Sequence, residues 1–242
     1  MNLLILDAGH SFSTAGKRNE KENFYEWQFN NDMQYKIKAR CEDLGIKVFL
    51  TNPNPNKVLD IPLTTRSNLA NDYWIKNNKC KSIFISIHAN AFSNSNTRGT
   101  ETYIASNAST TSKNFAKVLN DNIVSVMKKL DPASKDRGVK SENFTVIYKA
   151  SMPSVLVEYG FYSNLEDLKI LKNNQAELAE ATVKAICSYF NIEYKEKVKV
   201  NENKSNGLYA VCVGAYKDRN KANSIVEELK EKGYTSTYLI VR

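Results

Sequence analysis

Residues 3–10 read LLILDAGH, a run of large apolar residues that leads through an aspartate and a glycine to His10. The pattern recurs twice, in largely apolar runs that end at His88 and at Glu158. Short apolar runs of this kind are typical of buried strands in a parallel sheet. Because ligands bind beyond the carboxyl ends of such strands, we expect the three side chains to lie in one crevice. The chain has 2 histidines, and both fall there.

Strands and helices are predicted to alternate up to about residue 190, which is the pattern of βα units around a parallel sheet. The predicted strands are 2–7, 46–50, 82–88, 100–104, 144–148 and 154–158. The predicted helices are 24–44, 64–77, 110–130, 165–172 and 175–190. Gly45 follows the first of these helices and is expected to end it. We therefore predict an α/β fold with a twisted, mostly parallel sheet and helices on both faces.

The C-terminal part has a different pattern. Residues 191–206 alternate lysine and glutamate with almost no apolar residues after Tyr194, which predicts a charged linker. Beyond it, the pattern predicts a small βαβ unit with strands at 208–213 and 235–241 and a helix at 221–232. A unit below roughly 40 residues seldom folds alone, so we expect it to pack against another surface.

The composition of the chain limits the kinds of molecule that it is expected to bind. The net charge of +8 favours an anionic partner, but the charge is spread along the chain, so no nucleic-acid-binding segment is expected. No apolar run approaches the roughly 20 residues of a transmembrane helix. Met1 and Asn2 lead directly into the first strand without the pattern of a signal peptide, so we expect synthesis in the cytoplasm.

Two histidines are too few for a catalytic zinc site, which typically has three protein ligands. Of the nearby glutamates, Glu26 alone falls on the apolar face of the helix predicted at 24–44. A buried carboxylate needs a partner because an unpaired buried charge is costly. Zinc held by His10 and His88 would satisfy it, and so would an ion pair with Arg66.

Glu158 emerges from a predicted buried strand into the same crevice. It could be a fourth metal ligand, a general base, or one partner of a salt bridge at a strand end. We favour the general base, because a hydrolytic metal site needs an open coordination position and a carboxylate that handles the proton of water.

Several motifs together carry a resemblance to a known family. In chain order they are Leu6-Asp7-Ala8-Gly9-His10, Glu26 with Asn30, Leu63 with Arg66, Ser86-Ile87-His88-Ala89-Asn90, Arg137-Gly138-Val139-Lys140, and Glu158-Tyr159-Gly160-Phe161 with Asn164. Their order and separations resemble the zinc-dependent N-acetylmuramoyl-L-alanine amidases of the type 3 family over residues 2–190. The resemblance implies the type 3 amidase fold, one zinc ion bound by His10, Glu26 and His88, and Glu158 as the catalytic residue.

The resemblance also implies a reaction. Its substrate is peptidoglycan, cut at the amide between N-acetylmuramic acid and the L-alanine of the stem peptide, by zinc-activated water with Glu158 as general base and acid. We expect action on the cell wall after release from the cell, as a phage endolysin or a bacterial autolysin. Ala8 and Ser11 replace the usual proline and glycine beside His10, and the loop 12–25 is polar, which is expected to alter substrate fit and not metal binding.

Two other functions remain open at this point. A zinc carboxypeptidase acting on stem peptides would use similar ligands, but it would need an arginine that binds a carboxylate, for which Arg66 and Arg137 are candidates. A cell-wall-binding protein that has lost activity would not need Glu158.

Residues 207–242 resemble one half of a SPOR-type peptidoglycan-binding domain. The resemblance gives a domain organisation of a zinc amidase domain at 1–190, a linker at 191–206, and a half SPOR-like module at 207–242. Two chains could each supply one half, so we predict a homodimer through 207–242, with docking onto the catalytic domain as the alternative.

Overall fold

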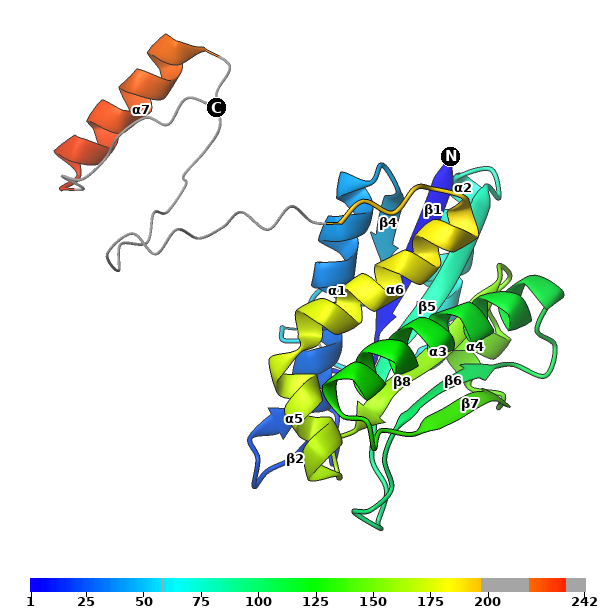
Figure 1. The fold of residues 1–242 in the computed structure, drawn as a ribbon. Coiled ribbons are helices and arrows are strands. Elements are labelled where there is room, and N and C mark those ends of the chain that lie inside the picture. Colours follow the sequence, from blue (N-terminus) through cyan, green and yellow to red (C-terminus); the bar gives the residue numbers. More distant parts are fainter. Residues whose placement is uncertain (58, 197–217, 234–242) are drawn as a thin grey trace. The chain divides into compact units, whose positions relative to one another are not determined.

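The computed structural model describes residues 1–57, 59–196 and 218–233. The chain divides into two units, Met1–Glu196 and Lys197–Arg242 (Figure 1). The first unit contains β1 (Asn2–Ala8), β2 (Arg18–Asn19), β3 (Phe24–Tyr25), α1 (Glu26–Asp43), β4 (Lys47–Leu50), α2 (Leu63–Lys76), β5 (Lys81–Asn90), β6 (Thr100–Ile104), α3 (Thr110–Leu130), β7 (Asp136–Ser141), α4 (Thr145–Tyr148), β8 (Ser154–Phe161), α5 (Leu165–Asn173) and α6 (Gln175–Phe190). In the second unit the structure describes α7 (Arg219–Glu231).

The main sheet has 6 strands in the order β4-β1-β5-β8-β6-β7. Strand β1 pairs in parallel with β4 and β5, β5 pairs in parallel with β8, and β6 with β7. Strands β6 and β8 are antiparallel. The predicted mostly parallel sheet is therefore confirmed, and it places the carboxyl ends of β1, β5 and β8 side by side.

Helices cover both faces of this sheet, as predicted (Figure 1). Alternate residues of β1 belong to different apolar clusters: Leu4 and Leu6 pack with α1, α3 and α6, whereas Leu3 and Ile5 pack with α2 and α4. Both clusters are built from side chains with almost no exposed surface. Apolar side chains on both faces explain why the strands read as continuous apolar runs. Helix α1 stops just before Gly45, whose φ of 76° suits the residue that ends a helix.

One predicted strand is wrong. Residues 144–148 were expected to be extended because they are β-branched and aromatic, but Thr145–Tyr148 form the single helical turn α4. Its Val146 and Ile147 are buried against the α2 side of the sheet. A short apolar run has no periodicity that separates a buried strand from a buried helical turn. The strand β7 lies at the sheet edge and was not predicted, because its sequence is polar and contains a glycine.

The second unit is described only at α7, which agrees with the helix predicted at 221–232. The side chain of Asp218 caps this helix by accepting hydrogen bonds from the backbone N–H groups of Asn220 and Lys221. The strands predicted at 208–213 and 235–241 lie outside the described residues. The half SPOR-like module and the homodimer through 207–242 stay predictions for the same reason.

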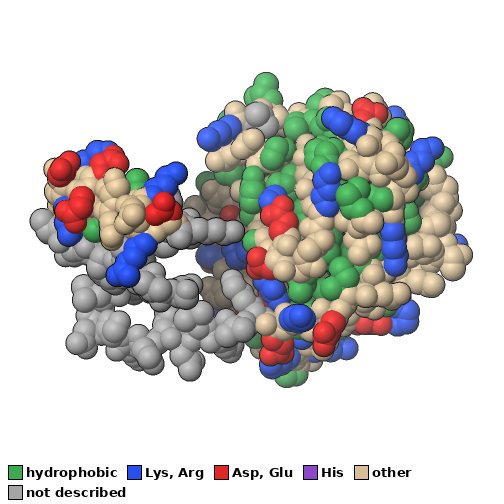
Figure 2. Space-filling model, turned by 90° about the horizontal axis from the view of Figure 1, so that it is seen from above, with side chains coloured by type: hydrophobic (Ala, Val, Ile, Leu, Met, Phe, Trp, Pro, Cys, Tyr) green, Lys and Arg blue, Asp and Glu red, His purple; other side chains and the backbone are tan. Residues whose placement is uncertain are grey.

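The surface carries mixed charge. Figure 2 views the end of the sheet at which β1 begins, and there basic and acidic side chains are scattered among hydrophobic ones. No histidine is visible in this view, because both histidines lie toward the other end of the strands. Within the described parts of the chain, no helix combines the length and the apolar character needed to cross a membrane.

Candidate metal centre

The structure brings His10, Glu26 and His88 together. His10 follows β1, His88 lies near the end of β5, and Glu26 is the first residue of α1. One carboxylate oxygen of Glu26, Oε1, lies 3.3 Å from Nε2 of His10 and 3.0 Å from Nδ1 of His88. The two imidazole rings are almost perpendicular, with centroids 5.0 Å apart. Three side chains from distant parts of the sequence therefore converge on one point.

Glu26 is held as a carboxylate. Its side chain is 3% exposed, and the backbone N–H of Ala89 also donates to Oε1, over 3.3 Å. Burial alone would raise the pKa of Glu26, but the hydrogen bonds and charges of His10 and His88 outweigh burial and lower this pKa to about 2. Burial also lowers the pKa of His88, which favours the neutral imidazole that binds metals.

These residues fit a zinc ion. The donor atoms of His10, Glu26 and His88 all lie within 4.8 Å of one another. Zinc bonds of about 2.0–2.2 Å in a tetrahedral arrangement place ligand atoms about 3.4 Å apart, close to the two observed separations from Glu26. Two histidines and one glutamate form a common catalytic zinc set, which leaves a fourth position for water or substrate.

Glu158 lies directly beside this cluster. It pairs in register with His88 across the parallel strands β5 and β8. Its Oε2 atom is buried and has no hydrogen-bond partner among the described residues. Burial, followed by the negative charges of Glu26 and Glu101, raises the pKa of Glu158 well above its ordinary value. A carboxyl group with a raised pKa and an unused oxygen is suited to accept a proton and give it back.

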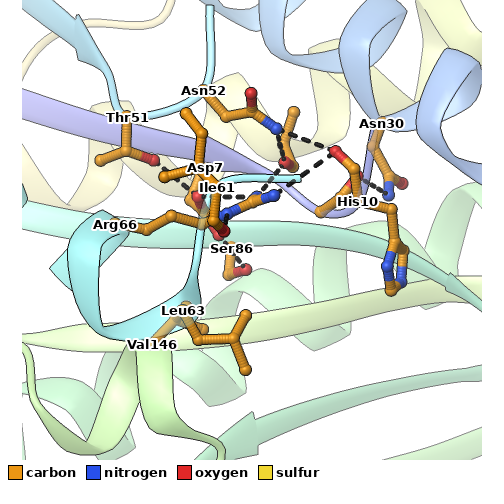
Figure 3. Close-up of polar contacts among 12 residues, drawn as sticks. Asp7, His10, Asn30, Thr51, Asn52, Ile61, Leu63, Arg66, Ser86 and Val146 are labelled. Carbon is orange, nitrogen blue, oxygen red and sulfur yellow. Dashed lines mark hydrogen bonds and ion pairs between the residues drawn. The ribbon is translucent and has the colours of Figure 1, made fainter. Parts of the chain in front are cut away.

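The backbone that carries His10 has a left-handed conformation, with φ of 64° at His10. Such a conformation is uncommon for a residue other than glycine and needs support from its surroundings. Buried side chains donate hydrogen bonds to three successive carbonyl groups, those of Ala8, Gly9 and His10 (Figure 3). The donors, which we call the carbonyl clamp, are Asn30 of α1, Asn52 after β4 and Arg66 of α2.

The guanidinium of Arg66 is occupied by these hydrogen bonds to carbonyl groups and by ion pairs with Asp7 and Asp60. It is 1% exposed, its Nη1 lies 3.2 Å from Asp7, and its Nη2 lies 2.5 Å from Asp60. Arg66 therefore does not supply the ion pair with Glu26 that the sequence left open. It is also too deeply buried to bind a substrate carboxylate, which removes one of the two candidates for the carboxylate-binding arginine of a carboxypeptidase.

The lack of a side chain at Gly9 leaves space for the imidazole ring of His88. A Cβ atom at Gly9 would lie 2.1 Å from Cε1 of the His88 ring, far inside contact distance. Replacing Gly9 by alanine should displace the imidazole and weaken zinc binding by about 10–100-fold, as expected when a group that orients a ligand is disturbed. Competition with a chromophoric chelator measures this affinity.

Gly160→Ala is the matched control for Gly9→Ala. A Cβ atom at Gly160 has no contact closer than 3.3 Å, and its neighbours are Asp167 and Met127 instead of a proposed metal ligand. This variant should keep the zinc affinity of the unaltered protein. Equal zinc affinity in both variants would show that the close approach of Gly9 does not position His88.

Sequence reasoning missed two groups around the centre. Asn52 was not singled out, although it lies two residues beyond β4, the strand that pairs with β1, and this position was the available signal. Glu101 was not singled out, yet it is buried and pairs in register with Glu158 across β6 and β8. Nothing in the one-dimensional pattern indicates that β6 lies next to β8.

A mostly parallel sheet with a His-Glu-His cluster beside the carboxyl ends of its strands defines an α/β protein with a candidate metal site. Residues 4–188 match the Amidase_3 family, described as N-acetylmuramoyl-L-alanine amidase. The chain belongs to this family.

Individual relatives agree with the family. The sporulation-specific N-acetylmuramoyl-L-alanine amidase of Bacillus subtilis (strain 168) is 25% identical over 247 residues, which cover 98% of this chain and 84% of that protein. The catalytic domain of CwlV, an N-acetylmuramoyl-L-alanine amidase from Bacillus (Paenibacillus) polymyxa var. colistinus, is 29% identical with a TM-score of 0.67, over 80% of this chain and 100% of that one. An N-acetylmuramoyl-L-alanine amidase from Clostridium difficile 630 is 30% identical with a TM-score of 0.66, over 78% of this chain and 96% of that one.

Proposed function

We propose that this protein is a zinc-dependent peptidoglycan amidase that cleaves between N-acetylmuramic acid and the L-alanine of the stem peptide. The single observation that carries the proposal is the His10-Glu26-His88 cluster with Glu158 beside it, in a chain of the amidase family. His10, Glu26 and His88 would hold the metal. Bound zinc supplies Lewis-acid polarisation of the scissile carbonyl and acidifies water.

Glu158 performs the proton transfers in this proposal. Its Oε2 atom accepts a proton from the attacking water and then donates it to the nitrogen of the leaving L-alanine. The raised pKa of Glu158 supports the second role, because a stronger acid would give up its proton to solvent before the amine departs.

The proposed biological setting is lysis of a bacterial cell wall after the enzyme has left the cytoplasm. The name of the Bacillus subtilis relative, which matches 98% of this chain, supports an autolysin of sporulation. A phage endolysin would use the same chemistry. Binding of glycan by the half SPOR-like module at 207–242 belongs to the same proposal.

Mass spectrometry of fragments released from purified peptidoglycan tests the function. We expect free stem peptides that begin with L-alanine, no release by metal-stripped protein, and recovery on adding Zn²⁺. Removing the metal should cost at least about 10²-fold in rate, since Lewis-acid stabilisation is worth several kcal/mol. Mg²⁺ should not restore activity, because it prefers oxygen ligands.

Other product patterns would contradict the proposal. Muropeptides shortened at the C-terminus of the stem would indicate a carboxypeptidase. Binding to peptidoglycan without any release, by protein shown to contain zinc, would indicate a binding protein. Full activity in the metal-stripped protein would exclude the zinc mechanism while leaving the amidase assignment intact.

A further inference from the structure

A row of three residues crosses the sheet at the candidate site. His88 of β5 pairs in register with Glu158 of β8, and Glu158 pairs in register with Glu101 of β6. Residues paired across neighbouring strands project from the same face, and adjacent strands lie about 4.8 Å apart. Glu101 therefore lies on the far side of Glu158 from the metal ligand, about 10 Å from His88 along the row.

Glu101 is a buried anchor for two cations. Its side chain is 2% exposed, and its Oε1 accepts hydrogen bonds of 2.7 Å from both Asn90 and Tyr103. Its Oε2 accepts from Nε of Arg137 over 2.6 Å and from Nζ of Lys140. One carboxylate thus faces two positive side chains, so the group formed by Glu101, Arg137 and Lys140 carries a net positive charge.

Two contacts hold the guanidinium of Arg137, and part of the side chain is exposed to solvent. Its Nε is bound to Glu101, and its guanidinium lies over the ring of Phe161, 4.9 Å from the ring centroid. Within the described residues, its two terminal nitrogens make no hydrogen bond, and the side chain is 31% exposed. A guanidinium held in this way is organised in advance to bind a carboxylate through two parallel hydrogen bonds.

We propose that Arg137, anchored by Glu101, binds the free α-carboxylate of the second stem-peptide residue during cleavage. This proposal rests on the proposed amidase function. The second residue of the stem is a glutamate joined through its side-chain carboxyl, so its α-carboxylate is free unless amidated. Two extended residues span about 7 Å, and a hydrogen bond adds about 3 Å, which is comparable with the backbone spacing of about 10 Å between His88 and Glu101, whose carboxylate holds Arg137.

The other candidate arginine cannot take this role, because Arg66 is buried and paired with Asp7 and Asp60. Lys140 contributes charge but no planar fork, and its Nζ lies 5.8 Å from the ring centroid of Tyr103. We therefore assign recognition of the substrate carboxylate to Arg137, whereas Lys140 adds positive charge nearby.

Two muropeptides that differ only in amidation of the second residue test the inference. The zinc-loaded enzyme should have a kcat/KM at least about 10-fold higher for the muropeptide with a free carboxylate, because a charge-assisted hydrogen bond is lost on amidation. Arg137→Met should remove the preference, because the kcat/KM for the acidic muropeptide should fall to that for the amidated muropeptide. Arg137→Lys, which keeps the charge without the fork, should keep only part of the preference.

Binding separates this inference from the proposed function. Calorimetry with zinc-loaded Glu158→Gln protein measures the affinity for each muropeptide without turnover. A tighter complex with the acidic muropeptide, lost when Arg137→Met is added, supports the inference even if cleavage occurs at another bond. Equal affinity for the two muropeptides, or an equal loss for both in Arg137→Met, would overturn it.

Discussion

Replacing Glu158 by glutamine is expected to lower kcat on peptidoglycan by about 10²–10⁴-fold while zinc binding is retained. Glutamine has nearly the same shape but cannot accept the proton of water or return it to the leaving amine. Glu158 makes no hydrogen bond through Oε2 within the described residues, so the exchange should cost little stability. The kcat is measured on purified peptidoglycan, and bound zinc is measured on the same preparation by elemental analysis.

Two variants define what this result means. Glu166→Gln removes an exposed carboxylate of α5 and should change neither rate nor zinc content. His88→Ala should lose zinc and activity together, because it removes a proposed ligand. If Glu158→Gln lost its zinc as His88→Ala does, Glu158 would be a fourth ligand, and if it kept full activity, another group would have to handle the protons.

The strands that carry the proposed centre could be predicted from sequence because burial on both faces produces largely apolar runs. Such runs mark β1, β5 and β8, and their parallel pairing places their ends together. Helix α3 has the predicted bounds, Thr110–Leu130, because its apolar residues repeat at helical spacing over many turns. The turn α4 was mistaken for a strand because five residues are too few to show any period.

The surroundings of the centre could not be predicted in the same way. Glu101 and Arg137 belong to strands whose neighbours are fixed by topology, since β6 joins β8 in antiparallel fashion at the one change of direction in the sheet. The carbonyl clamp is similar, because its three donors come from separate elements and meet only after folding. The sequence pattern of one strand or helix does not show which residues of other elements will contact it after folding.

Replacing Arg66 by methionine is expected to destabilise the protein by about 3–5 kcal/mol, the cost of leaving a buried charge without its partner. Asp7 is 1% exposed and, among the residues that the structure describes, would keep only the hydroxyl groups of Thr51 and Ser86 as partners. The carbonyl groups of Ala8 and His10 would also lose a donor of the carbonyl clamp. Urea unfolding of the zinc-free protein measures the free energy of unfolding without a contribution from metal binding.

A double variant separates the buried charge from the lost packing. Adding Asp7→Asn to Arg66→Met removes the unpaired carboxylate, so the pair should be less destabilised than the sum of the two single changes, with a coupling of about 1–3 kcal/mol. Arg18→Met, which removes an exposed arginine paired with Glu20, should change stability by less than about 1 kcal/mol. A loss below about 1 kcal/mol in Arg66→Met would mean that water solvates the Asp7 carboxylate or that this carboxylate takes up a proton. If the losses of stability in Arg66→Met and Asp7→Asn simply add, the ion pair between Arg66 and Asp7 contributes no stability of its own. Arg66 would then stabilise the fold through its hydrogen bonds to the backbone carbonyl groups of the carbonyl clamp.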